Sequence, residues 1–149
     1  MNTAKFLICV GVVLFVQGHA AAQEPDAGKI EFLSSCGACH GSDAKGKGPI
    51  ADQLKVTPAD LTQLAKKNGG VFPSNAVYEK IDGRQEDQAH GRRDMPVWGF
   101  RYMHSPKLWS DFAFNPTGSH IDPSEDPETT VRKRILSLVD YLYRIQEKD

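Results

Sequence analysis

Hydrophobic residues recur along this 149-residue chain at the spacing of helices, most clearly near its C-terminal end. Five apolar side chains follow one another at intervals of four, three, four and three residues: Val131, Ile135, Leu138, Leu142 and Ile145. These intervals place all five on one face of a helix. Asp126 followed by Pro127 is a typical helix start, because aspartate caps a first turn in which proline needs no amide hydrogen. The pattern predicts a long final helix with one buried face.

A shorter helix is predicted over residues 26–35, with Ile30 and Leu33 on its apolar side. This helix is the natural partner for the buried face of the final helix. Residues 41–48 follow, rich in glycine, lysine, serine and aspartate, and Pro49 ends the run. Such a composition predicts a flexible loop.

Two further helices are predicted in the middle of the chain. Thr57 before Pro58 is a helix start, and the glycine-rich residues 68–70 end that helix. Ser74 can cap another helix, which Gly83 would stop. No strand-like alternation of comparable length occurs, so the expected fold class is all-α.

The first 22 residues have the order of a secretory signal peptide. Lys5 precedes an apolar run over residues 6–16, and three alanines end at Ala22, the expected cleavage site. A retained anchor would need roughly 20 apolar residues, and Cys9 lies inside the run rather than at its end, which disfavours lipid attachment. We therefore expect residues 23–149 to form one exported domain, with no membrane span after cleavage.

Residues 36–40 read Cys36-Gly37-Ala38-Cys39-His40. Each thiol can add across a vinyl group of haem, and the adjacent histidine can bind the iron, so the spacing is a c-type haem attachment signature. A structural zinc site would want four ligands, and only these two thiols remain once Cys9 is removed. A thioredoxin-like redox pair would need a βαβ setting, which the pattern lacks. The motif can also arise by chance, but export makes haem attachment the favoured interpretation.

The charge balance is weakly acidic. Removal of Lys5 leaves 17 of the 18 basic residues against 19 acidic ones, a formal charge of −2. Nucleic-acid partners favour dense basic patches, so this balance argues against them.

The exported chain, the motif at residues 36–40 and the later Met95-Pro96 together resemble the class I, monohaem c-type cytochromes of the bacterial periplasm. The resemblance implies the cytochrome c fold, in which short helices surround one covalently attached haem. In that family a segment like residues 46–49 supplies a proline carbonyl, here that of Pro49, to the iron-binding histidine. Other matching positions are Gly28 and Phe32 in the family's first helix, where a glycine permits close crossing by the final helix. The helix start at residues 58–61 also matches, as do Leu138, Tyr141 and Leu142 in the closing helix.

The second axial ligand is expected to be Met95, because a thioether opposite histidine raises the haem potential and a Met-Pro pair on an irregular loop can approach the iron. Met103 is the less favoured methionine. Trp98 is expected to pack against the macrocycle. The remaining candidates are His90, His104 and His120 as ligands, and Arg84, Arg92, Arg93 and Arg101 as solvated residues or partners of the haem propionates.

Residues 99–126 are longer than the family needs before its closing helix, and we interpret them as an insertion loop. They carry Phe100, Tyr102, Trp109, Phe112 and Phe114. This aromatic content favours a cluster that covers the haem flank, or alternatively a docking surface for a redox partner.

The resemblance implies an electron carrier rather than an enzyme, either free or as the cytochrome subunit of an oxidoreductase. Its partners would be redox proteins, such as a periplasmic dehydrogenase, an oxidase or another cytochrome. The alternative is a haem enzyme, or a ligand-binding or sensing haem protein, with an open distal position. A single Cys-x-x-Cys-His sequence excludes a multihaem conduit within the chain.

Overall fold

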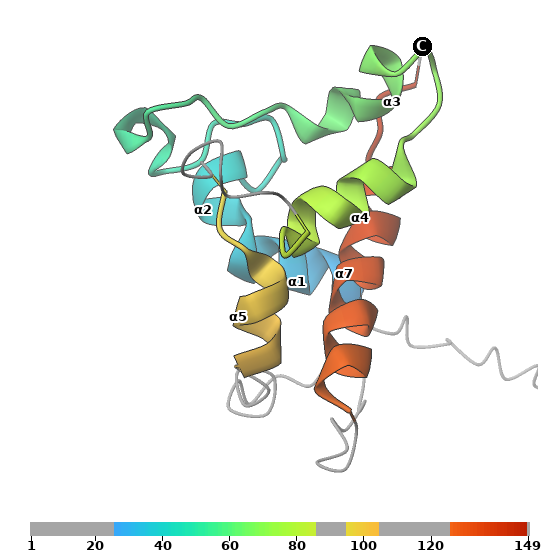
Figure 1. Cartoon of the computed structure of the whole chain (residues 1–149). Helices are drawn as coiled ribbons and strands as arrows, with labels where there is room; N and C mark the ends of the chain where they lie inside the picture. The colour runs from blue at the N-terminus through green and yellow to red at the C-terminus, as the bar shows by residue number, and fades with distance from the viewer. Residues whose placement is uncertain (1–25, 86–94, 105–125, 149) are drawn as a thin grey trace, which may run out of the picture.

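A computed structural model of the chain describes residues 26–85, 95–104 and 126–148. The predicted signal peptide and residues 86–94 and 105–125 lie outside these ranges. The described parts are helical and contain no strand, in agreement with the predicted all-α class (Figure 1). Their elements are α1 (Ala27–Ser35), α2 (Gly37–His40), the 3-10 turns η1 (Ala51–Gln53) and η2 (Leu61–Gln63), α3 (Leu64–Lys67), α4 (Ser74–Asp82), α5 (Trp98–His104) and α7 (Pro127–Arg144). None of these helices has the length and apolar content needed to cross a bilayer.

The long helix α7 is the centre of the packing, and α1, α4 and α5 all lie against it (Figure 1). Its side chains Val131, Ile135 and Leu138 are completely buried, as the apolar spacing predicts. Asp126 caps the helix by accepting a hydrogen bond from the Thr129 amide at 3.2 Å. The predicted final helix and its start are therefore confirmed.

The crossing of α1 over α7 depends on Gly28. A Cβ atom at this position would lie 2.1 Å from the Ser137 carbonyl oxygen, so only glycine lets the two backbones come this close. Phe32, one turn later, is fully buried with its ring 5.3 Å from that of Tyr141. The close crossing and its partner helix match the expectation. The predicted apolar side of α1 was wrong, however, because Leu33 is 45% exposed while Phe32 faces the core.

A buried ionic network ties α1, α5 and α7 together. The Glu31 carboxylate accepts two hydrogen bonds from the Arg134 guanidinium, from Nε and Nη2, each at 3.1 Å. It also accepts the Tyr102 hydroxyl at 2.8 Å and the Ser35 hydroxyl at 2.6 Å. Glu31 is only 1% exposed, and Arg134 lies 3.8 Å from the centre of the Tyr102 ring. The two charges thus lie inside the core, where each requires the other.

A second ion pair joins the N-terminal end of α1 to the C-terminal end of α7. Asp26 caps α1 through the Lys29 amide at 3.0 Å and accepts two hydrogen bonds from Arg144 at 2.8 Å each. The hydrogen bonds from Arg144 hold the pKa of Asp26 below its ordinary value of 3.8.

An Asp26→Asn variant tests this pair, because asparagine keeps the helix cap but removes the charge. A depressed carboxylate pKa stabilises the fold above the ordinary value, and the gain is lost as the pH falls through the folded pKa. We expect the wild type to exceed the variant by about 0.5 kcal/mol in unfolding free energy at pH 7, and this gap to shrink below pH 3.8. Urea unfolding at several pH values measures it. Asp52→Asn, at an exposed position, is the control, and a gap that does not change with pH would contradict the prediction.

The predicted insertion loop was wrong in its first residues, because residues 99–104 belong to helix α5 and are not part of a loop. Trp98 and Tyr102 lie one turn apart and pack with ring centroids 5.5 Å from each other. Tyr102 is 2% exposed and hydrogen-bonded in the core, whereas Phe100 is 47% exposed. Burial of one aromatic face against α7 explains the helix. The remaining aromatic residues of the predicted insertion, Trp109, Phe112 and Phe114, lie outside the described residues.

Of the two helices predicted in the middle of the chain, one is confirmed and one begins later than expected. Helix α4 spans Ser74–Asp82 and stops at Gly83, whose left-handed φ of +70° is typical of a helix stop. The predicted cap was wrong, because Ser74 is the first helical residue and Pro73 precedes it as the N-cap, with no side-chain hydrogen bond. Thr57 and Pro58, however, do not start a helix. Asp60 is the cap instead, and its side chain accepts the Thr62 amide at 2.9 Å at the start of η2.

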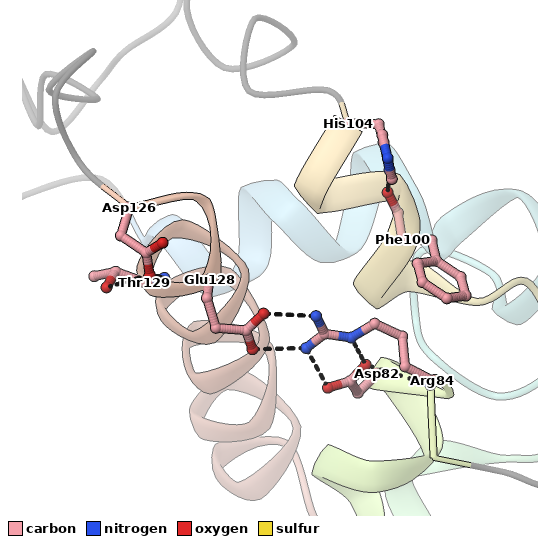
Figure 2. A network of polar contacts seen from close by, with 7 residues as sticks. All are labelled: Asp82, Arg84, Phe100, His104, Asp126, Glu128 and Thr129. Carbon is pink, nitrogen blue, oxygen red and sulfur yellow. Dashed lines mark hydrogen bonds and ion pairs between the residues drawn. The ribbon is translucent and has the colours of Figure 1, made fainter.

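Arg84 lies just beyond α4 and bridges two carboxylates (Figure 2). It donates from Nε to Asp82 at 2.5 Å and from Nη1 to Glu128 on α7 at 2.6 Å. The backbone of Gly99 on α5 approaches this group so closely that a Cβ there would lie 2.1 Å from Asp82 Oδ1. The network therefore joins the end of α4 to the first turn of α7, with Gly99 of α5 close against it. The guanidinium expected to be solvated or to pair with a haem propionate is instead bound to these two carboxylates.

Candidate cofactor-binding site

Cys36, Cys39 and His40 occupy one short turn of backbone at the end of α1. The Cys36 amide closes α1 by donating to the Phe32 carbonyl at 2.8 Å. The Cys36 carbonyl then accepts the amides of Cys39 at 3.1 Å and His40 at 2.9 Å, which starts α2. Both thiols are free and half-buried. The turn thus presents two thiols and an imidazole together without joining the thiols in a disulfide.

The glycine-rich residues after α2 wrap back around it. The Gly46 amide donates to the His40 carbonyl at 2.8 Å, and the Gly48 amide donates to the Cys39 carbonyl at 3.0 Å. A Cβ on Gly48 would lie 2.3 Å from the Ala38 carbonyl oxygen. Residues 41–48, predicted to be a flexible loop, therefore form a glycine-rich cap around α2, since their amides donate hydrogen bonds to the carbonyls at the end of that helix.

The His40 ring is held by a backbone carbonyl. Its Nδ1 lies 3.0 Å from the Ala59 oxygen, and a carbonyl can only accept, so Nδ1 carries the hydrogen and Nε2 keeps its lone pair. Metal-binding histidines in proteins are usually oriented by such a bond. The arrangement therefore leaves Nε2 as the ligand atom.

The acceptor differs from the one that the resemblance implied. The expected carbonyl was that of Pro49, but Pro49 is exposed and the acceptor is Ala59. The reason lies in Gly46, whose φ is +79° and whose missing Cβ leaves room for the Pro58 carbonyl. Residues 58–59 can therefore lie directly against Gly46 in the glycine-rich cap around α2. The sequence carried little signal for this role, since a backbone carbonyl can come from any residue.

Met95 and Trp98 lie at the beginning of the α5 segment. Residues 95–97 are not helical, so Met95 precedes α5 on irregular backbone, as expected. Met95, Trp98 and Cys36 are all partly buried and pack against the same hydrophobic core. Arg101 lies over the Trp98 ring at 5.2 Å from its centre. Met95 and Cys36, from two separate parts of the candidate site, thus border the same core.

Of the other ligand candidates, the structure describes Met103 and His104, and the rest lie outside the described residues. Met103 is half-buried within α5. His104 is exposed, and its Nδ1 lies 2.8 Å from the Phe100 carbonyl of the same helix (Figure 2). His90 and His120, and the arginines Arg92 and Arg93, lie outside the described residues.

Apolar side chains next to the Cys-His turn are left open to solvent. Ile50 and Leu54 flank η1, which packs against α2, and Val56 follows; all three are exposed. Leu61, Leu64 and Phe72 are partly buried at the edge of the core. A flat apolar group attached at this turn would find apolar surface to cover.

The Cys36 thiol is not set up as a reactive thiolate. Burial, followed by the negative charges of Glu31 and Cys39, raises the pKa of Cys36 to about 12. Redox-active thiol pairs have the opposite property, a lowered pKa that yields thiolate at neutral pH. The environment therefore disfavours a thiol-disulfide role for Cys36.

The donor set as a whole fits a c-type haem, since two free thiols and an oriented imidazole occupy one turn beside open apolar surface. Within residues 26–85, 95–104 and 126–148, no group of three or more His, Cys, Asp or Glu side chains is placed to hold a bare metal ion. Comparison with known proteins found no matching family model, no matching curated protein and no matching solved structure.

Proposed function

We propose that the chain has the cytochrome c fold, carries one haem c joined to Cys36 and Cys39, and acts as an electron carrier rather than an enzyme. The observation that supports this most is the hydrogen bond between His40 Nδ1 and the Ala59 carbonyl, in the same turn as two free thiols. An oriented imidazole beside paired thiols is the ligand arrangement that a covalently bound haem requires.

The protein residues have distinct roles in this proposal. When bound, the haem supplies a one-electron couple between ferrous and ferric iron. Cys36 and Cys39 would fix its position, and His40 through Nε2 and Met95 through its thioether would hold the iron. Trp98 would pack beside the haem. Two protein ligands present in both oxidation states would limit rearrangement on electron transfer.

The proposed setting is the bacterial periplasm, which rests on the signal-like residues 1–22. The proposed partners are redox proteins: a dehydrogenase, an oxidase or another cytochrome. The chain would serve them as a free carrier or as the cytochrome subunit of an oxidoreductase.

Expression of the full chain in a host with a haem-attachment system tests the proposal. We expect one haem that remains bound after denaturation, seen as an added haem mass and as the spectrum of the haem in alkaline pyridine. Cys36→Ser and Cys39→Ser should each remove one thioether bond and change that spectrum, since each thiol binds one vinyl group.

Cys9→Ser is the matched control and should leave attachment unchanged, because Cys9 precedes the expected cleavage site. Wild-type protein that carries no covalent haem would refute the proposal. Rapid carbon monoxide binding by the reduced wild type would instead support the alternative, a haem enzyme or sensor with an open distal position.

A further inference from the structure

The residues after α7 run on from the helix end and lie against the segment at 61–65 (Figure 1). The Gln146 side chain makes three hydrogen bonds, two of them to this segment and one to α7. Its side-chain amide nitrogen donates to the carbonyls of Leu61 at 2.8 Å and Leu142 at 2.7 Å, and its oxygen accepts the Ala65 amide at 2.8 Å. One side chain thus joins the end of α7 to both ends of this segment.

Glu147 adds contacts on the same side. Its backbone amide donates to the Thr62 carbonyl at 2.9 Å. Its carboxylate accepts hydrogen bonds from the Gln63 side chain and, at 2.8 Å, from Lys45. Lys45 belongs to the glycine-rich cap around α2, so Glu147 reaches both segments that flank His40.

The segment at 61–65 is linked in turn to the His40 ring. Ala59, whose carbonyl binds His40 Nδ1, lies two residues before Leu61. The Leu61 amide donates to the Ala44 carbonyl at 2.8 Å, and Ala44 is completely buried within the cap. The position of the Ala59 carbonyl therefore depends on how firmly Leu61 and Thr62 are held.

From these contacts we propose that Gln146 and Glu147 are positioning residues for His40. They fix the 61–65 segment, and through it the Ala59 carbonyl that orients the imidazole. A strong bond from Nδ1–H makes the ring a better electron donor to a metal at Nε2. A better donor favours ferric over ferrous iron, so these residues keep the potential of the site low. This inference rests on the proposed haem site.

A Gln146→Ala variant of the full haem-loaded chain tests the proposal. We expect its midpoint potential to rise, because a looser Ala59 carbonyl weakens the His40 hydrogen bond. The exchange rate of the His40 Nδ1 proton, followed by NMR, should increase about tenfold as local opening becomes easier. Glu147→Ala, at an exposed position, should change both quantities in the same direction by less, and it replaces Gln146→Ala if that variant does not fold.

Arg144→Gln is the matched control, because Arg144 also anchors the end of α7 but contacts Asp26 and Asp140 instead. This control should lower stability without changing the potential or the proton exchange. If Gln146→Ala and Glu147→Ala resemble the control in both readouts, the positioning role is refuted while the haem site stands. If the wild type binds no covalent haem, the proposed function fails and this inference fails with it.

Discussion

A Met95→Leu variant of the haem-loaded protein is expected to lose its thioether ligand and to have a lower midpoint potential. A methionine opposite histidine raises the potential, and axial ligands set haem potentials over a range of roughly 0.8 V. The charge-transfer band between sulfur and ferric iron should disappear, and the reduced variant should bind carbon monoxide readily. Leucine conserves the volume and apolar character of the site, so the partly buried position should tolerate it.

Met103→Leu provides the control, because Met103 is also partly buried against the core but belongs to α5. This variant should keep the band and the potential of the wild type. The opposite result, in which Met103→Leu loses the band and Met95→Leu keeps it, would assign the distal ligand to Met103. A wild-type potential in both variants would reject methionine ligation.

The largest effect on stability is expected from Arg134→Met. This change removes the Arg134 guanidinium from the buried Glu31 carboxylate, which keeps its hydrogen bonds from the Tyr102 and Ser35 hydroxyls. Removal of one partner of a buried ion pair costs about 3–5 kcal/mol, because the remaining charge is not compensated. The midpoint of thermal unfolding should fall by roughly 10–20 °C. Denaturant unfolding followed by circular dichroism measures the loss.

A second substitution separates charge from packing. Glu31→Leu combined with Arg134→Met should recover at least half of the lost stability, since an apolar pair of similar volume often replaces a buried ion pair without cost. Arg132→Met, at an exposed position on the same helix, should change stability by no more than about 0.5 kcal/mol. A double variant no more stable than Arg134→Met alone would contradict a charge-based explanation.

The helices with local start and stop signals were those that the sequence predicted best. Helix α7 has a regular apolar spacing and an Asp-Pro start, and α4 ends at Asp82, directly before the predicted stop at Gly83. Helix α5 was not predicted, because the contacts that stabilise it join residues far apart in the sequence. Tyr102 is stabilised by a carboxylate 71 residues earlier in the chain, and no local pattern reveals such a bond. The Thr57 start failed because Asp60, three residues later, competes as the cap.

For the candidate site, the sequence predicted the side chains but not the backbone that orients them. Cys36, Cys39 and His40 must lie in one turn because of their spacing. The Ala59 carbonyl was not predictable, because its position comes from contacts with Gly46 rather than from its own side chain. The Glu31–Arg134 pair, however, could have been predicted in part from the sequence. Glu31 follows Gly28 by three residues, so it lies on the face of α1 that the close crossing buries, and a buried carboxylate there requires a cationic partner.

The central place of α7 also has a consequence for the order in which the protein can fold. Synthesis proceeds from the N-terminus, so the cysteine-bearing helix α1 exists for most of translation without the helix that covers it. Contacts between α1 and α7 span about a hundred residues, and such non-local contacts form late because loop closure precedes them. Until then Cys36 has not acquired its buried environment. The newly made chain therefore passes through a stage in which both thiols are accessible, before the last helix closes over α1.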